Sequence, residues 1–170
     1  MNKRRKIFFA LTLLWMAGIF AFSSRSGSKS TEDSYFAGTV VGRIFVPGYE
    51  EWTAEEQKIF AEKIDHPVRK SAHAAEYAAL GVLAAGTCIP ARKEDTVRRR
   101  RIFREFLLPW GVASLYAATD EFHQLFVPGR SGQFSDVLLD SAGALAGMLI
   151  LTAGRILWHR RQQIRNSGAV

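Results

Sequence analysis

The sequence predicts an all-α protein, an integral membrane bundle of about four transmembrane helices, and two observations support this. Apolar residues gather in four runs, at 7–22, 71–89, 106–119 and 137–158, which predict spans at about 7–24, 70–89, 105–126 and 137–158. The 23 basic residues cluster mainly at alternate ends of these runs. A helix needs about 20 apolar residues to cross the hydrocarbon core, a length that these ranges approach. We therefore expect one membrane domain, residues 1–170, with residues 25–69 forming an outer loop between the first two spans.

The placement of charge predicts how these spans are oriented. With the N-terminus inside, the predicted inner segments hold fifteen basic residues: Lys3, Arg4, Arg5 and Lys6; Arg92, Lys93, Arg98–Arg101 and Arg104; Arg155, Arg160, Arg161 and Arg165. The outer segment from Ser23 to Lys70 balances seven basic residues against eight acidic ones. Because cytoplasmic loops are rich in Lys and Arg, both termini are predicted to be cytoplasmic. The net charge of +7 alone would suit nucleic acid, but its clustering at the ends of apolar runs indicates membrane topology, so the predicted partner is a lipid bilayer and no nucleic acid.

The first run has two interpretations. It follows four basic residues and ends in Ala21-Phe22-Ser23, so it is similar to a signal peptide with a small-residue cleavage site. Its apolar stretch is slightly longer than the core of most signal peptides, which favours a retained span. Cleavage would leave three spans and change no other assignment.

The outer loop is predicted to contain short helices. Ser30-Thr31-Glu32-Asp33 and Thr53-Ala54-Glu55-Glu56 each place a hydroxyl three residues before a carboxylate, a capping-box pattern. After the first box an apolar stripe recurs at helical spacing, formed by Ala37, Val40, Val41, Ile44 and Phe45. This stripe either lies along the membrane surface or packs on the outer ends of the spans. After the second box, residues 54–63 are predicted to form a separate polar helix.

The remaining spans follow from local signals. Pro67 suits the first turn of the second span. The third extends through Asp120 to Phe126, where Pro128-Gly129 is expected to stop it. In the fourth, Gly143 and Gly147 share a helix face with the acidic residues and allow a neighbouring helix to approach closely.

Polar residues of all four spans are predicted to lie at one depth. Counting from the basic clusters at 1.5 Å per residue puts Ser23, Glu76, Asp120 and Asp140 at about 22–26 Å, just inside the outer interface. Ionisable groups at such positions mark function by default, or else neutralise one another within the bundle. The candidate ligand-binding residues are Ser23, Ser24, Lys70, His73, Glu76, Tyr77, Asp120, Glu121, Gln124, Arg130, Asp136 and Asp140.

Four segments of the chain resemble the motifs of one family. They are Phe22-Ser23-Ser24-x-Ser26, Arg69-Lys70-x-x-His73-x-x-Glu76-Tyr77-x-x-Leu80-Gly81, Asp120-Glu121-x-x-Gln124-x-Phe126-x-Pro128-Gly129-Arg130-Ser131-Gly132 and Asp136-x-x-x-Asp140-x-x-Gly143-x-x-x-Gly147. In order and spacing the chain resembles the VanZ-like family of bacterial membrane proteins. The resemblance implies the cytoplasmic (inner) membrane and the cell envelope. The family's namesake is linked to low-level resistance to teicoplanin, a lipid-tailed glycopeptide. Position 140 is often Asn in that family, which favours hydrogen bonding over charge there.

Three functions fit these residues. In the first, the outer cluster binds a polar envelope ligand such as a lipid headgroup, a peptidoglycan precursor or a lipoglycopeptide. Lys70 and Arg130 would then hold an anionic phosphate or carboxylate. Asp120, Glu121 and Gln124 would hold amines and amides.

The second function is enzymatic and the third is structural. His73-x-x-Glu76 places a base and a carboxylate one turn apart, a set suited to acid–base chemistry or to a metal that activates water. Against an enzyme, no HExxH, GxSxG or CxxC motif occurs, and neither a metal site nor a cofactor is predicted. In the structural hypothesis the charged core only stabilises a small membrane subunit.

Overall fold

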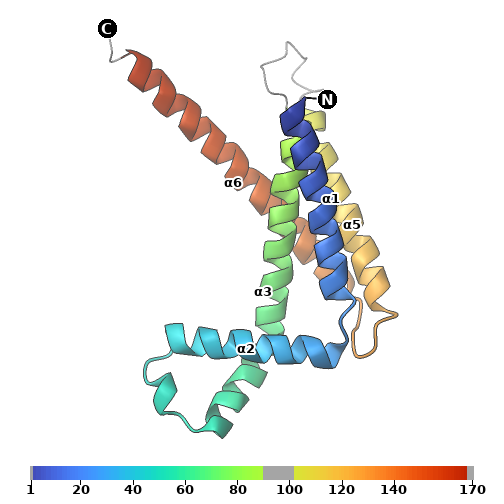
Figure 1. Ribbon diagram of the computed structural model, residues 1–170, viewed down its shortest axis with the longest axis vertical. Helices are drawn as coiled ribbons and strands as arrows, with labels where there is room; N and C mark the ends of the chain where they lie inside the picture. The colour runs from blue at the N-terminus through green and yellow to red at the C-terminus, as the bar shows by residue number, and fades with distance from the viewer. Residues whose placement is uncertain (1, 90–101, 168–170) are drawn as a thin grey trace.

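The computed structural model describes residues 2–89 and 102–167, in which every regular element is helical. The elements are α1 (Lys3–Ser23), α2 (Gly27–Phe45), a short 3-10 helix η1 (Tyr49–Glu51), α3 (Ala54–Cys88), a π-helical turn η2 (Phe103–Leu107), α5 (Leu108–Gln124) and α6 (Phe134–Ser167). Figure 1 shows α1, α3 and α5 side by side, with α2 lying across one end. The predicted all-α class is confirmed. Of the predicted inner basic cluster, the residues from 92 to 101 lie outside the described part of the chain, and Arg104 lies within it.

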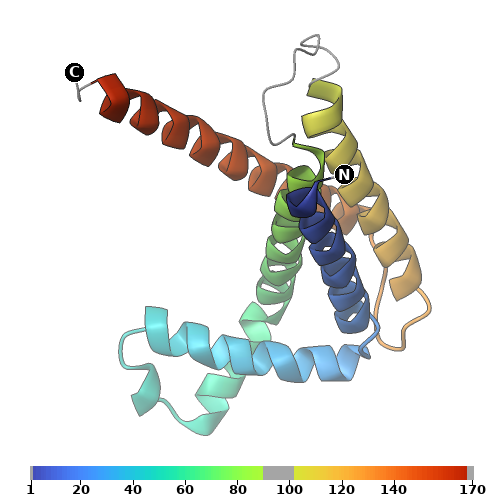
Figure 2. The same cartoon turned by 45° about the horizontal axis from the view of Figure 1, so that its top comes forward.

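Two of the described helices, α1 and the Phe134–Asn166 part of α6, are long and apolar enough to cross a membrane. Only 17% and 22% of the residues in their apolar stretches are buried in the protein. The core helix of a water-soluble protein would bury most of that stretch, whereas these helices leave most of their apolar side chains uncovered by the described protein. Figure 2 shows the C-terminal half of α6 diverging from the other helices.

The second and third predicted spans correspond to shorter or more polar helices. The 17-residue α5 is extended at its N-terminal end by η2, which gives a continuous helical segment over 103–124. The second half of α3, which contains the predicted span 70–89, carries His73 and Glu76. The four-span bundle is therefore not established by these helices alone.

Helix α3 corrects the prediction of a separate helix before the second span. Its 35 residues run without interruption from Ala54 to Cys88, with Pro67 inside the helix. A proline lacks the N–H that would bond the carbonyl four residues earlier, here that of Lys63. Both Lys63 and Pro67 are exposed, so that carbonyl remains accessible to water. The predicted capping box at Thr53 and Glu56 is confirmed, with both reciprocal hydrogen bonds present.

Helix α2 begins earlier than predicted and packs through its glycines. It starts at Gly27, so Ser30 lies within the helix instead of capping it. A Cβ at Gly38 would lie 3.1 Å from the Ala61 side chain, and one at Gly42 would overlap the Tyr49 ring. The opposite face presents Val40 and other exposed apolar side chains. Because α2 packs through its glycine face, its apolar stripe remains available to a membrane surface.

Helices α3 and α6 cross with their backbones in contact. A Cβ at Gly143 would lie 2.4 Å from the Ala74 carbonyl oxygen, and one at Gly147 would lie 2.1 Å from that of Ala78. Small residues at a crossing allow this approach in membrane bundles. The contact places the first turns of α6 beside the middle of α3, where the polar residues of both helices lie.

Candidate functional site

The polar site lies where α1 and α5 end and α6 begins, and a tight turn closes it. Gly129 has a φ of +74°, a conformation that glycine adopts without strain. The preceding Pro128 carbonyl accepts a hydrogen bond from the Gly27 N–H at 2.9 Å. A Cβ at Gly27 would lie 2.1 Å from the Gly129 oxygen, so only glycine fits this contact. The turn thereby holds Arg130 against the end of α1.

Arg130 links three segments through its guanidinium. Its Nε donates to the Arg25 carbonyl at 3.3 Å, its Nη2 to the Phe22 carbonyl and its Nη1 to Gln124 Oε1, the last two at 3.5 Å. These bonds are long, so the guanidinium retains capacity for a stronger acceptor. Burial lowers the pKa of Arg130, and the nearby positive charge of Arg69 lowers it further. Two guanidinium groups therefore lie close enough to repel one another.

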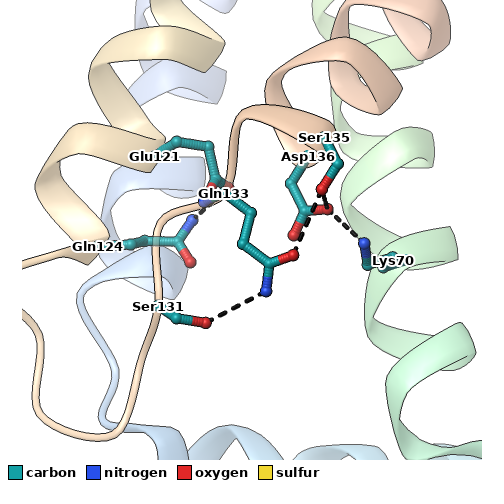
Figure 3. Close-up of polar contacts among 7 residues, drawn as sticks. All are labelled: Lys70, Glu121, Gln124, Ser131, Gln133, Ser135 and Asp136. Carbon is teal, nitrogen blue, oxygen red and sulfur yellow. Dashed lines mark hydrogen bonds and ion pairs between the residues drawn. The ribbon is translucent and has the colours of Figure 1, made fainter.

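A buried hydrogen-bond network joins α1, α5 and the start of α6. Ser23 Oγ donates to Asp120 Oδ2 at 2.8 Å, and Gln124 Nε2 donates to the same oxygen at 3.3 Å. Gln124 also bonds Glu121 Oε1 at 3.0 Å, and the Gln133 N–H donates to Glu121 Oε2 at 2.9 Å. Figure 3 shows Glu121 and Gln124 facing the loop that carries Gln133. These bonds tie the ends of α1 and α5 to the start of α6, and one oxygen of Asp120, Oδ1, takes no part in them.

Lys70 on α3 forms an ion pair with Asp136 on α6, at 2.5 Å between Lys70 Nζ and Asp136 Oδ1. Ser135 Oγ donates to the same carboxylate oxygen at 3.2 Å, as Figure 3 shows. Both charged side chains are partly buried. The positive charge of Lys70 is therefore compensated within the protein.

A cavity of about 130 Å³ lies among these groups. It is lined by His66, Arg69, Lys70, His73, Glu121, Gln124, Gly129, Arg130, Ser131, Gln133, Asp136, Leu139 and Asp140. Seven of the twelve residues singled out from the sequence are among these. Arg69 and His66 were missed, although Arg69 lies one turn before His73 and stands in the same motif. Arg69 and His73 are four residues apart and therefore share a helix face, which is the signal that could have identified Arg69.

The other predicted residues do not line the cavity. Ser23 and Asp120 belong to the buried network. Ser24 is exposed and contacts His123 Nε2 at 3.1 Å. Glu76 is half-buried, and its backbone carbonyl accepts from Trp15 Nε1 at 2.9 Å.

Several buried polar atoms have no hydrogen-bond partner within the described residues. They are His73 Nδ1, Tyr77 Oη, Asp120 Oδ1 and both carboxylate oxygens of Asp140, among others. Tyr77 and Asp140 have no solvent-exposed surface. Buried polar groups in proteins are nearly always bonded, so these atoms mark where a ligand, a water molecule or a proton belongs.

A metal-dependent site would need several ligands that converge. Within residues 2–89 and 102–167, no three His, Cys, Asp or Glu side chains are grouped so that they could hold a metal ion. The described cavity instead carries two guanidinium groups, two imidazoles and three carboxylates.

Comparison with known proteins identifies the family. The family model described as VanZ/LLP1 matches residues 8–158, from the first turns of α1 to the middle of α6, and includes every residue that lines the cavity. No curated protein and no solved structure matches the chain. The family match and the apolar α1 and α6 together indicate a membrane protein. The chain belongs to the VanZ/LLP1 family.

Proposed function

We propose that this protein binds the phosphate-bearing headgroup of an envelope lipid in the cavity between α3, α5 and α6. The observation that carries the proposal is the pair of guanidinium groups, Arg69 and Arg130, on the wall of one cavity. Two positive charges repel one another, and an anion bound between them offsets this repulsion. A guanidinium binds phosphate with two parallel N–H donors, which gives both energy and geometry.

The structure changes which residues would do the binding. Lys70 is paired with Asp136, so Arg69 replaces it as the partner of Arg130 in holding an anion. Arg69 contacts Asp65 Oδ2 at 2.8 Å on its own helix, through one nitrogen of its guanidinium. Glu121 and Gln124 serve the internal network and shape the cavity.

The size of the cavity favours a headgroup over a larger ligand. Pockets for drug-sized molecules measure roughly 300–1,000 Å³, whereas this one measures about 130 Å³. A lipid headgroup enters it, while a whole glycopeptide or peptidoglycan precursor does not. The acyl chains would lie against exposed apolar side chains of the helices. Any effect on teicoplanin susceptibility would then act through the bound lipid.

The proposal includes a topology. We place the protein in the bacterial cytoplasmic membrane, with α1, α3, η2–α5 and α6 as four spans and both termini in the cytoplasm. In Figure 1 the start of α1 and the end of α6 lie opposite α2, and both carry basic residues, as the positive-inside rule requires. The cavity then opens on the outer side, where α2 would lie on the membrane surface. Cysteine-labelling from outside at position 48 but not at position 160 would support this orientation.

The test is phospholipid binding by purified protein, measured by native mass spectrometry. Each charge-assisted hydrogen bond is worth about 1.5–3 kcal/mol, or roughly tenfold to hundredfold in affinity. We therefore expect Arg69→Ala to weaken binding by at least tenfold. Arg43→Ala is the matched control, because Arg43 is exposed on α2 and does not line the cavity. Equal loss in both variants, or none in either, would contradict the proposal.

A second candidate function is acid–base catalysis on the bound phosphate ester. It is favoured by His73, whose side chain lines the cavity together with Arg69 and Arg130. An imidazole beside a bound phosphate ester can accept or donate a proton during the reaction. Release of phosphate from a lipid phosphomonoester by wild type, but not by His73→Gln, would establish it. Binding without turnover would leave only the first function.

A further inference from the structure

The charges that line the cavity are balanced. Three basic side chains, Arg69, Lys70 and Arg130, face three acidic ones, Glu121, Asp136 and Asp140. A purely anionic ligand would add uncompensated negative charge to this set. The internal contacts of the cavity show which charges remain for a ligand.

Most of the acidic groups are already satisfied. Asp136 pairs with Lys70. Glu121 accepts from Gln124 and from the Gln133 N–H, one donor for each oxygen. Arg69 pairs with Asp65 through one nitrogen only, so its guanidinium keeps donors for a ligand. Two groups of opposite sign therefore stand out, the Arg69–Arg130 pair on one side and Asp140 on the other.

Asp140 is an unusual buried carboxyl group. It lies one turn after Asp136 on α6, is 0% exposed, and neither of its oxygens has a hydrogen-bond partner in the described part of the chain. The groups with the largest electrostatic effect on it are Glu121, Asp120, Asp136 and Glu76, all acidic. A buried carboxylate without a donor is strongly destabilised. Arg69, Lys70 and Arg130 line the same cavity, but none of them donates to Asp140 within the described residues, so a ligand can supply the missing donor.

We propose that the ligand headgroup is an aminoalkyl phosphate, with its phosphate between Arg69 and Arg130 and its ammonium group directed to Asp140. This inference rests on the proposed function and specifies its ligand. A zwitterion matches the balanced lining, and its ammonium N–H groups supply donors for the two free oxygens of Asp140. A quaternary ammonium carries the same charge but no N–H, so it satisfies the electrostatics and leaves the carboxyl unbonded.

The test compares three phospholipids that share acyl chains and differ in headgroup. Wild-type protein in nanodiscs is titrated with phosphatidylethanolamine, phosphatidylcholine and phosphatidylglycerol. We expect phosphatidylethanolamine to bind at least tenfold more tightly than the other two. Asp140→Asn keeps the side-chain shape and removes the charge, and we expect it to reduce this preference to below about threefold, while affinity for phosphatidylglycerol does not fall.

The outcomes separate this inference from the proposed function. Equal affinity for the three lipids, still lost in Arg69→Ala, would overturn the aminoalkyl inference and leave phosphate binding intact. Lipid affinity that is the same in Arg69→Ala as in wild type would overturn the proposed function itself. Free phosphoethanolamine that binds as tightly as the lipid would replace the lipid with a soluble ligand. The wild-type comparison requires no variant, so it decides the question even if Asp140→Asn fails to accumulate.

Discussion

The α3–α6 crossing gives a quantitative test of the fold, through Gly147→Ala. The new Cβ would lie 2.1 Å from the Ala78 carbonyl oxygen, whereas real Cβ contacts essentially never fall below 3.0 Å. The two helices would have to separate by about 0.9 Å at this point. The neighbour is backbone and has no rotamer to change, so the cost is that of overpacking, about 1–3 kcal/mol.

Gly154→Ala on the same helix is the matched control, because nothing lies within 4 Å of its added Cβ. Both variants gain the same helix propensity, about 1 kcal/mol. Their difference therefore isolates the clash. We expect Gly147→Ala to be less stable than Gly154→Ala by about 1–3 kcal/mol, or by roughly 2–4 °C in Tm per kcal/mol. Thermal unfolding in detergent, followed by circular dichroism, measures this difference. Equal melting temperatures would refute the backbone contact between α3 and α6.

Two further predictions concern the hydrogen bonds of single side chains. Ser23→Ala removes a buried donor to Asp120, so we expect it to lower the free energy of unfolding by about 1.5–3 kcal/mol. Ser24 is exposed, so we expect a smaller loss in Ser24→Ala. Similar losses in the two variants would show that the network is not buried. Hydrogen bonds from Thr53 hold the pKa of Glu56 below its usual range. The stabilisation that the Glu56 carboxylate gives to the start of α3 is therefore fully present above the pKa of Glu56 in the unfolded chain, and is lost as pH falls through its pKa in the folded protein. We expect hydrogen-exchange protection at the start of α3 to fall as pH falls in wild type, and to be independent of pH in Glu56→Gln, whose amide oxygen can still accept from the Thr53 N–H. A pH-independent wild type would contradict this.

Sequence reasoning located the helices well because their signals are local. The capping box at Thr53 depends on four consecutive residues, and it forms as predicted. Pro67 was misread because a proline also suits the first turn of a helix, whereas here it lies inside α3 at an exposed position, where water can bond the carbonyl that lacks a donor. The early start of α2 follows from the Gly27–Pro128 contact, which joins residues far apart in the chain.

The sequence predicted many of the residues of the candidate site, but not how their side chains are arranged in space. Helical periodicity shows which residues share a face, but it does not show how neighbouring helices are rotated about their axes. Sequence reasoning therefore could not separate Asp120, in the buried network, from Asp140, on the cavity wall. The pairing of Lys70 with Asp136 also depends on that rotation. Because Lys70 is paired, Arg69 takes its place as the second basic residue beside Arg130.

The central claim is that a phosphate group occupies the cavity between Arg69 and Arg130. The most direct measurement is an experimental structure of the protein in nanodiscs made from bacterial lipid. The account predicts phosphate density within hydrogen-bond distance of both guanidinium groups, with the acyl chains along the outer surface of the helices. A cavity that holds only water, with ordered lipid bound elsewhere on the protein, would contradict it.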